Sequence, residues 1–308
     1  MLIVKKYQVW LMLILATLFW AGNFVFGSYV VNEMDPIWMT FSRWVLALFL
    51  LFPIAYIVEK PNWKLIKKDW PFLLLNGILG IIGYNLILYS ALEFTSSTNA
   101  SLVAAMNPAV IVVASVILLK EKLSKLQLLG FLTSLVGAVV ILTQGDISRI
   151  VHLDFNKGDL LMIGAIVVWT FYSIIGKRLT LPPISATAVS TLFAMTLLAP
   201  FAFSQGFPIP DLSPLALTGI VYFVLFPSVG SFIFWNIAVR EIGASQSGIF
   251  LNLIPVFTAI ISMILGEMIT FVQVLGGLFV FLGVYLTTGL LDKKLSAKRE
   301  KTDLRKSG

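Results

Sequence analysis

The stretch 126–144 reads LQLLGFLTSLVGAVVILTQ, and the stretch 271–290 reads FVQVLGGLFVFLGVYLTTGL; neither contains a charged residue. A helix needs about 20 mostly apolar residues to cross about 30 Å of hydrocarbon, so each stretch can form one membrane span. Other stretches of this kind occupy 9–29, 36–57, 71–92, 97–118, 159–177, 184–204, 214–236 and 246–265. The sequence therefore predicts an all-α integral membrane protein with ten transmembrane helices.

The composition excludes several classes of function. Hydrophobic residues make up 58% of the chain and charged residues 12%, whereas a soluble domain carries about 25% charge. The chain has no cysteine, and its one histidine, His152, stands in a polar connection, so thiolate, Ser-His-Asp and His-cluster zinc sites have no residues to form them. No phosphate-binding loop of the type GxxxxGK(S/T) occurs. We expect no enzyme activity, no cofactor and no metal site.

The basic residues predict the orientation in the membrane. With the N-terminus in the cytoplasm, all of the 22 Lys and Arg residues except Arg43, Arg149 and Lys157 fall at the cytoplasmic side. Such a bias is the positive-inside rule, so the net charge of +7 indicates membrane orientation and not nucleic-acid binding. We expect a multi-pass protein of the cell membrane with both termini in the cytoplasm and a basic cytoplasmic tail at 291–308.

The two halves of the chain repeat the same pattern. Glycines at 130 and 137 are matched by glycines at 276 and 283, and Pro108 is matched by Pro255. Further pairs in the same order are Trp20 with Trp169, Gly83 with Gly230, Ala91 with Ala238, and Leu119-Lys120-Glu121 with Leu265-Gly266-Glu267. Five spans per half is an odd number, so the second half enters the membrane from the opposite side. Matched connections also exchange their charge bias, which predicts two inverted five-helix repeats.

These residues resemble a known family. The segment 91–102 (ALEFTSSTNASL), Asn107-Pro108, Glu121 and the paired glycines are similar to the EamA module of the drug/metabolite transporter superfamily. The resemblance implies a first repeat at 1–144, an outer connection at 145–158 and a second repeat at 159–290. It also implies a central cavity lined mainly by helices 1, 3, 4, 6, 8 and 9, and export of a small solute.

Polar and aromatic side chains within the spans are the candidate solute-binding residues. Polar side chains in spans usually face the interior of the bundle, and an Asn amide can both donate and accept hydrogen bonds. Pro108 and Pro255 each lie about midway along a span, where proline frees a backbone carbonyl or merely kinks the helix. The candidates are Trp20, Asn23, Asn85, Tyr89, Asn107, Pro108, Trp169, Tyr172, Asn252 and Pro255.

Arg43 is the one basic residue deep in a predicted span. It can pair with a carboxylate of the solute, or it can bond backbone carbonyls and stabilise the bundle. Its equivalent in the second half falls near Leu192, so the charge is not duplicated. Glu121 and Glu267 end matched spans, where we expect them to tie loops together. No carboxylate lies near the midplane, which gives proton coupling through a buried acid little support.

These observations predict a secondary transporter that moves a small metabolite by alternating access. The aromatic, largely uncharged set of candidates favours a neutral or aromatic amino acid or a similar amphipathic solute. The expected partners are the solute and the lipid bilayer, with no nucleic acid, and a homo-oligomer is left open. A channel and a membrane-embedded enzyme without a recognisable motif are the alternatives.

Overall fold

The computed structural model describes residues 5–95, 100, 103–143, 145–146, 156–204, 212–266 and 270–291. Within these ranges the regular structure is entirely helical. Eight helical stretches are long and apolar enough to cross a membrane, and two further apolar helices are shorter. The eight are Lys6–Gly27, Pro36–Val58, Trp63–Leu92, Lys125–Thr143, Lys157–Arg178, Pro183–Ser204, Pro214–Ile242 and Ala244–Ile264, and the shorter two are Asn107–Leu118 and Phe271–Thr287.

Two of these stretches contain a π-helix, which is a wider helical turn, at equivalent places in the two halves. One consists of α3 (Trp63–Asn76), the π-helix η1 (Gly77–Gly83) and α4 (Tyr84–Leu92). The other consists of α11 (Pro214–Phe223), the π-helix η2 (Val224–Ser231) and α12 (Phe232–Ile242). The first stretch begins eight residues before the predicted start at 71, because Asn62 caps the helix by accepting a hydrogen bond from Lys64 N at 2.9 Å.

The helices that carry the paired prolines are interrupted. α6 (Asn107–Leu118) follows a turn at 105–106, and Pro108 lies in its first turn. The matching stretch consists of α13 (Ala244–Ile249), the 3-10 helix η3 (Phe250–Asn252) and α14 (Leu253–Ile264), with Pro255 near the start of α14. Pro108 therefore stands at the start of a helical segment, where a missing N–H leaves no hydrogen bond unmade, and not in the middle of one continuous helix as predicted. Pro255 lies about midway along the stretch Ala244–Ile264, as predicted, shortly after its 3-10 turn.

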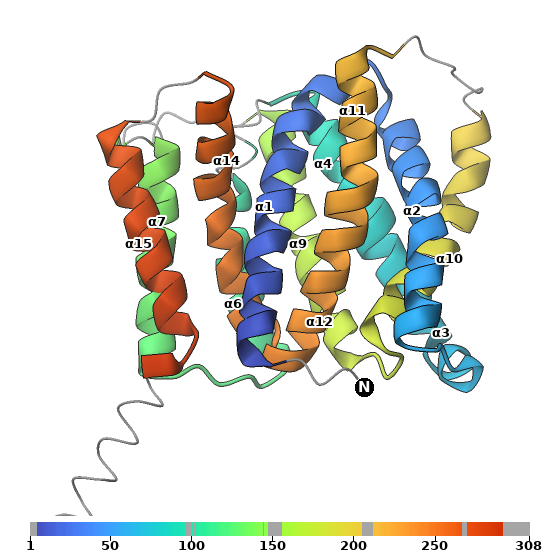
Figure 1. The fold of residues 1–308 in the computed structure, drawn as a ribbon, viewed down its shortest axis with the longest axis horizontal. Coiled ribbons are helices and arrows are strands. Elements are labelled where there is room, and N and C mark those ends of the chain that lie inside the picture. Colours follow the sequence, from blue (N-terminus) through green and yellow to red (C-terminus); the bar gives the residue numbers. More distant parts are fainter. Residues whose placement is uncertain are drawn as a thin grey trace, which may run out of the picture.

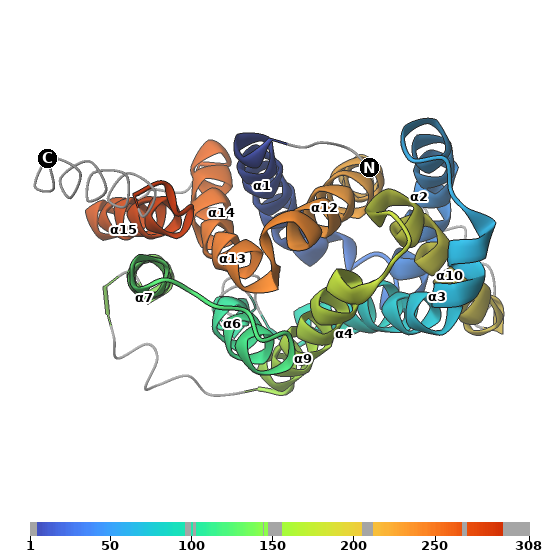
Figure 2. The ribbon, with the colours of Figure 1, turned by 90° about the horizontal axis from the view of Figure 1, so that it is seen from below.

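The last helices of the two halves form an antiparallel pair at one end of the molecule. α7 (Lys125–Thr143) and α15 (Phe271–Thr287) lie side by side, apart from most of the other helices (Figures 1 and 2). A Cβ atom added to Gly130 would lie 2.5 Å from the carbonyl oxygen of Gly283, and one added to Gly137 would lie 2.5 Å from that of Gly276. The first glycine of each helix thus faces the second glycine of the other helix, as in a two-fold contact between equivalent helices.

A second antiparallel pair forms at the other end of the molecule, where α2 (Pro36–Val58) packs against α10 (Pro183–Ser204) (Figure 1). Near the start of α2, the Trp38 and Phe203 ring centroids are 5.8 Å apart. Just after its end, Glu59 accepts hydrogen bonds from Ile184 N at 3.0 Å and Ser185 N at 2.7 Å. Both helices also carry prolines at matching positions, Pro36 with Pro183 and Pro53 with Pro200.

Carboxylates of the first half bind backbone N–H groups of the second half. Asp69 accepts hydrogen bonds from Thr180 N at 2.6 Å and Leu181 N at 2.8 Å. Glu121 accepts from Ala244 N at 3.0 Å and Ser245 N at 2.9 Å. Ala244 and Ser245 begin α13, where the free N–H groups of a helix start favour an anion, whereas Thr180 and Leu181 lie in the connection that precedes α10. Glu121 therefore makes the tie expected of it, and Glu267 lies outside the described residues.

The start of α1 (Lys6–Val30) and the end of α15 lie at the same end of the bundle (Figure 1). A Cβ atom added to Gly289 would lie 3.7 Å from Lys6 Nζ. Large apolar side chains such as Phe49, Tyr56 and Ile264 are exposed on the helix surfaces. A surface of this kind suits contact with lipid.

Candidate functional site

An aromatic cluster joins the two halves at the centre of the molecule. Trp20 of α1 and its equivalent Trp169 of α9 (Lys157–Arg178) have ring centroids 5.1 Å apart, with planes at 88°. Phe232 lies 6.1 Å from Trp20 and 5.4 Å from Trp169. We define this aromatic cluster as Trp20, Trp44, Tyr84, Trp169, Tyr172, Phe232 and Trp235. Edge-to-face contacts of this kind stabilise aromatic pairs beyond simple burial.

Arg43 lies beside the aromatic cluster and is 1% exposed. Its Nε donates to Ser228 Oγ at 2.8 Å, and its Nη1 donates to Asn23 Oδ1 at 3.0 Å, to Asn85 Oδ1 at 3.3 Å and to the Tyr89 hydroxyl. Nη2 reaches the carbonyl oxygen of Phe223 at 3.4 Å. We call this set the arginine cluster, and its members are Asn23, Arg43, Asn85, Tyr89 and Ser228.

The two π-helices position the acceptors of the arginine cluster. The Asn85 amide nitrogen donates to Gly80 O at 3.2 Å and Ile81 O at 2.9 Å, so it bonds carbonyls of the wide turn η1. This fixes the amide so that its oxygen faces Arg43. Ser228 follows Pro227 within η2. Asn85 lies just after η1 and Ser228 lies within η2, so each half supplies one acceptor beside its π-helix to the same guanidinium.

A second polar cluster occupies the matching place in the second half. Asn236 Nδ2 donates to the Tyr172 hydroxyl at 2.6 Å and to Thr187 Oγ1 at 2.9 Å. All three side chains are at most 5% exposed. We call Tyr172, Thr187 and Asn236 the neutral cluster. Counted from the paired prolines Pro36 and Pro183, the equivalent of Arg43 in α10 is Ser190, close to Leu192. The Ser190 hydroxyl is buried and has no hydrogen-bond partner in the described part of the chain.

The structure brings together most, but not all, of the predicted site residues. Trp20, Trp169 and Tyr172 meet in the aromatic cluster, and Asn23, Arg43, Asn85 and Tyr89 meet in the arginine cluster. The remaining four are Asn107, Pro108, Asn252 and Pro255, which are buried on α6, η3 and α14.

Asn252 and Asn107 make no described contact with the aromatic or the arginine cluster. The Asn252 amide donates to Ser134 Oγ of α7 at 2.8 Å, which directs it toward the α7–α15 pair. The carbonyl oxygens of both amides are buried and have no hydrogen-bond partner among the described residues. An unpaired buried acceptor of this kind is costly, so both amides stay candidates for a polar ligand.

Sequence reasoning missed Trp44, Thr187, Ser228 and Phe232, which have prominent places in the clusters. Trp44 follows Arg43 directly, and its ring centroid is 4.7 Å from that of Phe232. Ser228 follows Pro227, whose place in a span is itself a signal of irregular backbone. Phe232 and Thr187 carry no comparable signal, because a Phe or Thr in an apolar span is unremarkable in composition.

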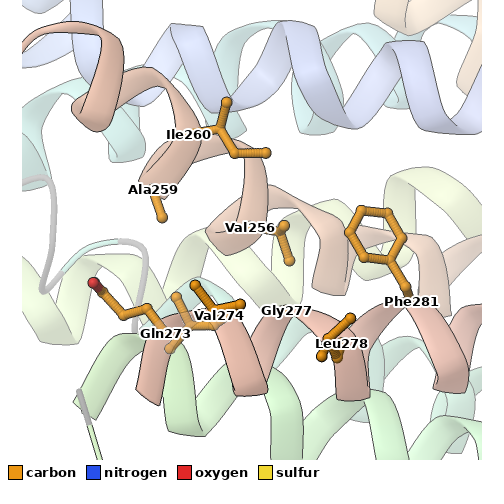
Figure 3. Close-up of a pocket in the computed structure, with 9 residues that line it drawn as sticks. Val256, Ala259, Ile260, Gln273, Val274, Gly277, Leu278 and Phe281 are labelled. Carbon is orange, nitrogen blue, oxygen red and sulfur yellow. The ribbon is translucent and has the colours of Figure 1, made fainter. Parts of the chain in front are cut away.

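Two pockets lie apart from these clusters. An apolar groove of about 200 Å³ runs between α14 and α15, with Val256 and Ile260 on one side and Val274 and Leu278 on the other (Figure 3). Its one polar lining residue, Gln273, accepts a hydrogen bond from Thr270 N at 2.9 Å. None of the predicted site residues lines this groove. It faces outward, since Val274 and Leu278 are at least half exposed.

A polar pocket of about 290 Å³ lies where α12 meets α13. Lys177 lines it together with Glu121, Glu241 and Gln246. Lys177 Nζ donates to Arg240 O at 2.6 Å, and Arg240 Nε donates to Gly176 O at 3.2 Å. This pocket is therefore lined by side chains of both charge signs, and its two basic groups bond backbone carbonyls.

Long apolar helices around a buried polar and aromatic centre define a multi-pass membrane protein. The chain belongs to the EamA-like transporter family, because the family model matches residues 8–143 and again residues 156–289. The family model thus matches the chain twice, once in each half. These two matches also confirm the family that the sequence resembles.

Curated relatives span nearly the whole chain. The "Uncharacterized transporter YyaM" of Bacillus subtilis (strain 168) is 30% identical over 292 residues, covering 93% of this chain and 95% of that protein. An "Uncharacterized transporter" of Archaeoglobus fulgidus is 30% identical over 283 residues, covering 90% and 96%. These names and the family assign the chain to membrane transporters.

A solved crystal structure shares the fold. It superposes with a TM-score of 0.73 at 21% sequence identity, and the match covers 92% of this chain and 98% of the other. This likeness concerns the fold alone.

Proposed function

We propose that this chain is a secondary transporter that moves a small solute by alternating access between two inverted five-helix repeats. The antiparallel contact between equivalent helices carries this proposal. In α7 and α15, Gly130 meets Gly283 and Gly137 meets Gly276, which is the pattern of a two-fold axis lying in the membrane plane. α2 and α10 are also antiparallel. Counting the two shorter apolar helices, the repeats contain ten spans.

The solute site is proposed to lie between the halves, at the aromatic cluster and the arginine cluster. Both clusters take side chains from both repeats, so a rearrangement of one repeat against the other would expose them to one side and then the other. Aromatic walls with polar edges suit a neutral or aromatic amino acid or a similar amphipathic metabolite. Asn107, Pro108, Asn252 and Pro255 are proposed to line the approach to this site.

The orientation and direction follow from other features. The start of α1 and the end of α15 lie at one end of the bundle, and the positive-inside rule assigns that end to the cytoplasm of the cell. Export is proposed by analogy with the EamA family. The same face carries the polar pocket beside Lys177, which would serve as the cytoplasmic entrance.

Counterflow in proteoliposomes tests the proposed function. Purified protein is reconstituted, loaded with an unlabelled metabolite and diluted into the labelled compound, across a panel of amino acids and amphipathic metabolites. A carrier gives saturable counterflow that needs solute on both sides. Flux that rises linearly with concentration would indicate a channel, and a changed product would indicate an enzyme.

Two substitutions test the site. Trp20→Ala and Asn107→Ala are expected to lower counterflow while leaving the amount of folded protein unchanged. Gly164→Ala is the matched control, because a Cβ atom at Gly164 would have no neighbour within 4 Å. Normal transport kinetics in both variants would remove Trp20 from the site and Asn107 from its approach.

A further inference from the structure

Arg43 is a buried cation whose described partners are all uncharged. Its hydrogen bonds go to one serine, one tyrosine, two asparagines and one backbone carbonyl. Among the described residues, no carboxylate accepts a hydrogen bond from it. The carboxylates of Glu59, Asp69 and Glu121 bind backbone N–H groups of the second half instead. A desolvated charge without a counter-charge is costly inside a membrane protein.

Aromatic rings offset part of this cost. The Arg43 guanidinium carbon lies 5.2 Å from the Phe223 centroid, 5.6 Å from that of Trp44 and 5.8 Å from that of Tyr89. Ring faces and neutral oxygens hold a cation in place without neutralising it. The site thus keeps a full positive charge, fixed in orientation, next to the aromatic cluster.

The second half of the chain shows that the packing itself does not require this charge. At the equivalent place α10 carries Ser190, and the neighbouring neutral cluster is held together by Asn236, Tyr172 and Thr187. Equivalent helices therefore pack in this fold with no guanidinium. A purely structural role would not explain why one half carries a buried cation.

We infer that Arg43 binds the carboxylate of the transported solute, so that the substrates of this site are small carboxylates with an apolar or aromatic body. The inference rests on the proposed transport function and names its substrate class. A carboxylate matches the planar fork of a guanidinium and would replace neutral acceptors such as Asn23 and Ser228. Trp44 contacts both Arg43 and Phe232, so the body of the solute would lie against the aromatic cluster.

Binding to the purified protein tests this inference independently of transport. The probes are L-phenylalanine, L-leucine and 3-phenylpropionate, each paired with its amide, and the readouts are intrinsic tryptophan fluorescence and thermal stabilisation. At least one carboxylate should bind saturably and at least tenfold more tightly than its amide. Equal binding of acid and amide, or no binding of any carboxylate at millimolar concentration, would overturn the inference.

Variants assign the preference to Arg43. Arg43→Gln should abolish the tenfold preference, and Arg43→Lys should keep part of it because the charge remains. Ser190→Ala, at the equivalent position of the other half, is the matched control and should leave the preference unchanged. If Arg43→Gln does not fold, Arg43→Lys carries the test: its preference for the acid should fall below that of the wild type, and an unchanged preference would remove Arg43 as the partner of the carboxylate.

Chloride is the competing anion, and a separate arm distinguishes it. The same titrations are run in sodium chloride and in sodium isethionate. A signal produced by chloride alone and lost in Arg43→Gln, without preference for carboxylates, would assign Arg43 to an inorganic counter-ion and contradict the inference. Saturable counterflow of amides would leave the transport function intact and refute only the substrate class. Binding of carboxylates without any counterflow would support the substrate class and refute the transport function.

Discussion

The arginine cluster and the neutral cluster occupy equivalent places in the two halves, and they differ in one essential respect. Asn23 and Tyr89 bond each other in the first half, with 3.1 Å between the Tyr89 hydroxyl and Asn23 Oδ1. In the second half their equivalents are Tyr172 and Asn236, with the two residue types exchanged. The hydrogen bond between the matched helices is thus kept in both halves, whereas the positive charge exists only in the first.

This difference separates what the repeat needs from what the site needs. The Asn–Tyr bond fixes the helices of each half, and it works in either order. Arg43 has no charged equivalent in the second half, so the site between the two similar halves is asymmetric. An asymmetric site suits an amphipathic solute, which has one polar end and one apolar end.

An arginine placed in the second half should have the largest effect on stability. Ser190→Arg would bury a guanidinium near the neutral cluster, which has no described acceptor arrangement like that of Asn23, Asn85 and Ser228. The expected loss of stability is about 3–5 kcal/mol. The yield of monodisperse protein after detergent extraction measures it, with Ser190→Ala as the control. A normal yield of Ser190→Arg would show that the second half can also accommodate a charge.

Substitution of the glycines between α7 and α15 should have the next largest effect on stability. Gly137→Leu and its equivalent Gly283→Leu force a side chain against a facing backbone, which costs about 1–3 kcal/mol or more. The two substitutions should lower the thermal unfolding midpoint to a similar extent, because they affect equivalent surfaces. A large effect of one with no effect of the other would contradict the two-fold contact.

The two Asn–Tyr pairs should respond differently to truncation. Asn236→Ala leaves the Tyr172 hydroxyl buried without this partner, whereas Thr187 keeps its bond to Pro183 O. We therefore expect a loss of about 1–3 kcal/mol. Tyr89→Phe removes one of several acceptors around Arg43 and should cost about 1 kcal/mol. Thermal unfolding of both variants in detergent compares them. A greater cost for Tyr89→Phe would mean that Arg43 depends chiefly on the phenol.

The smallest effect on stability is expected from the hydrogen bonds between Glu33 and Ser213. They link the two halves at the end of the bundle opposite the start of α1. Ser213 donates its backbone N–H and its hydroxyl to Glu33, at 2.8 Å and 2.7 Å, and these bonds lower the pKa of the Glu33 carboxyl. A lowered pKa in the folded state stabilises the protein above the ordinary carboxyl pKa, and this contribution is lost as the pH falls through the lowered value. The difference in unfolding midpoint between wild type and Glu33→Gln should therefore shrink from about pH 7 to about pH 3. A difference independent of pH would mean that the carboxylate charge is irrelevant.

The sequence predicts the helices well because long apolar runs have only one use in a bilayer. The predicted spans at 36–57 and 184–204 agree with the structure within one residue. The predicted start of α3 at 71 was wrong because the segment 63–70 is rich in lysine and resembles a loop. The π-helices and the 3-10 turn were not predicted, since their glycines and prolines are equally compatible with ordinary helix packing.

The candidate site was predictable in its residue types and not in its grouping. Polar and aromatic residues in spans identified Trp20, Asn23, Asn85, Tyr89, Trp169 and Tyr172. Which of them meet depends on helix rotation, and no periodicity fixes that. The separation of Asn252 from the arginine cluster, through its bond to Ser134, is a tertiary contact that a single sequence does not encode visibly.

Because the chain has no cysteine, labelling of a single introduced cysteine tests alternating access directly. Ser228→Cys is nearly isosteric and lies in the arginine cluster, where Ser228 is now fully buried. In oriented proteoliposomes, a membrane-impermeant maleimide should reach this position from either side, and a transported solute should protect it. Labelling from one side only, under all solute gradients, would contradict a site that opens to each compartment in turn.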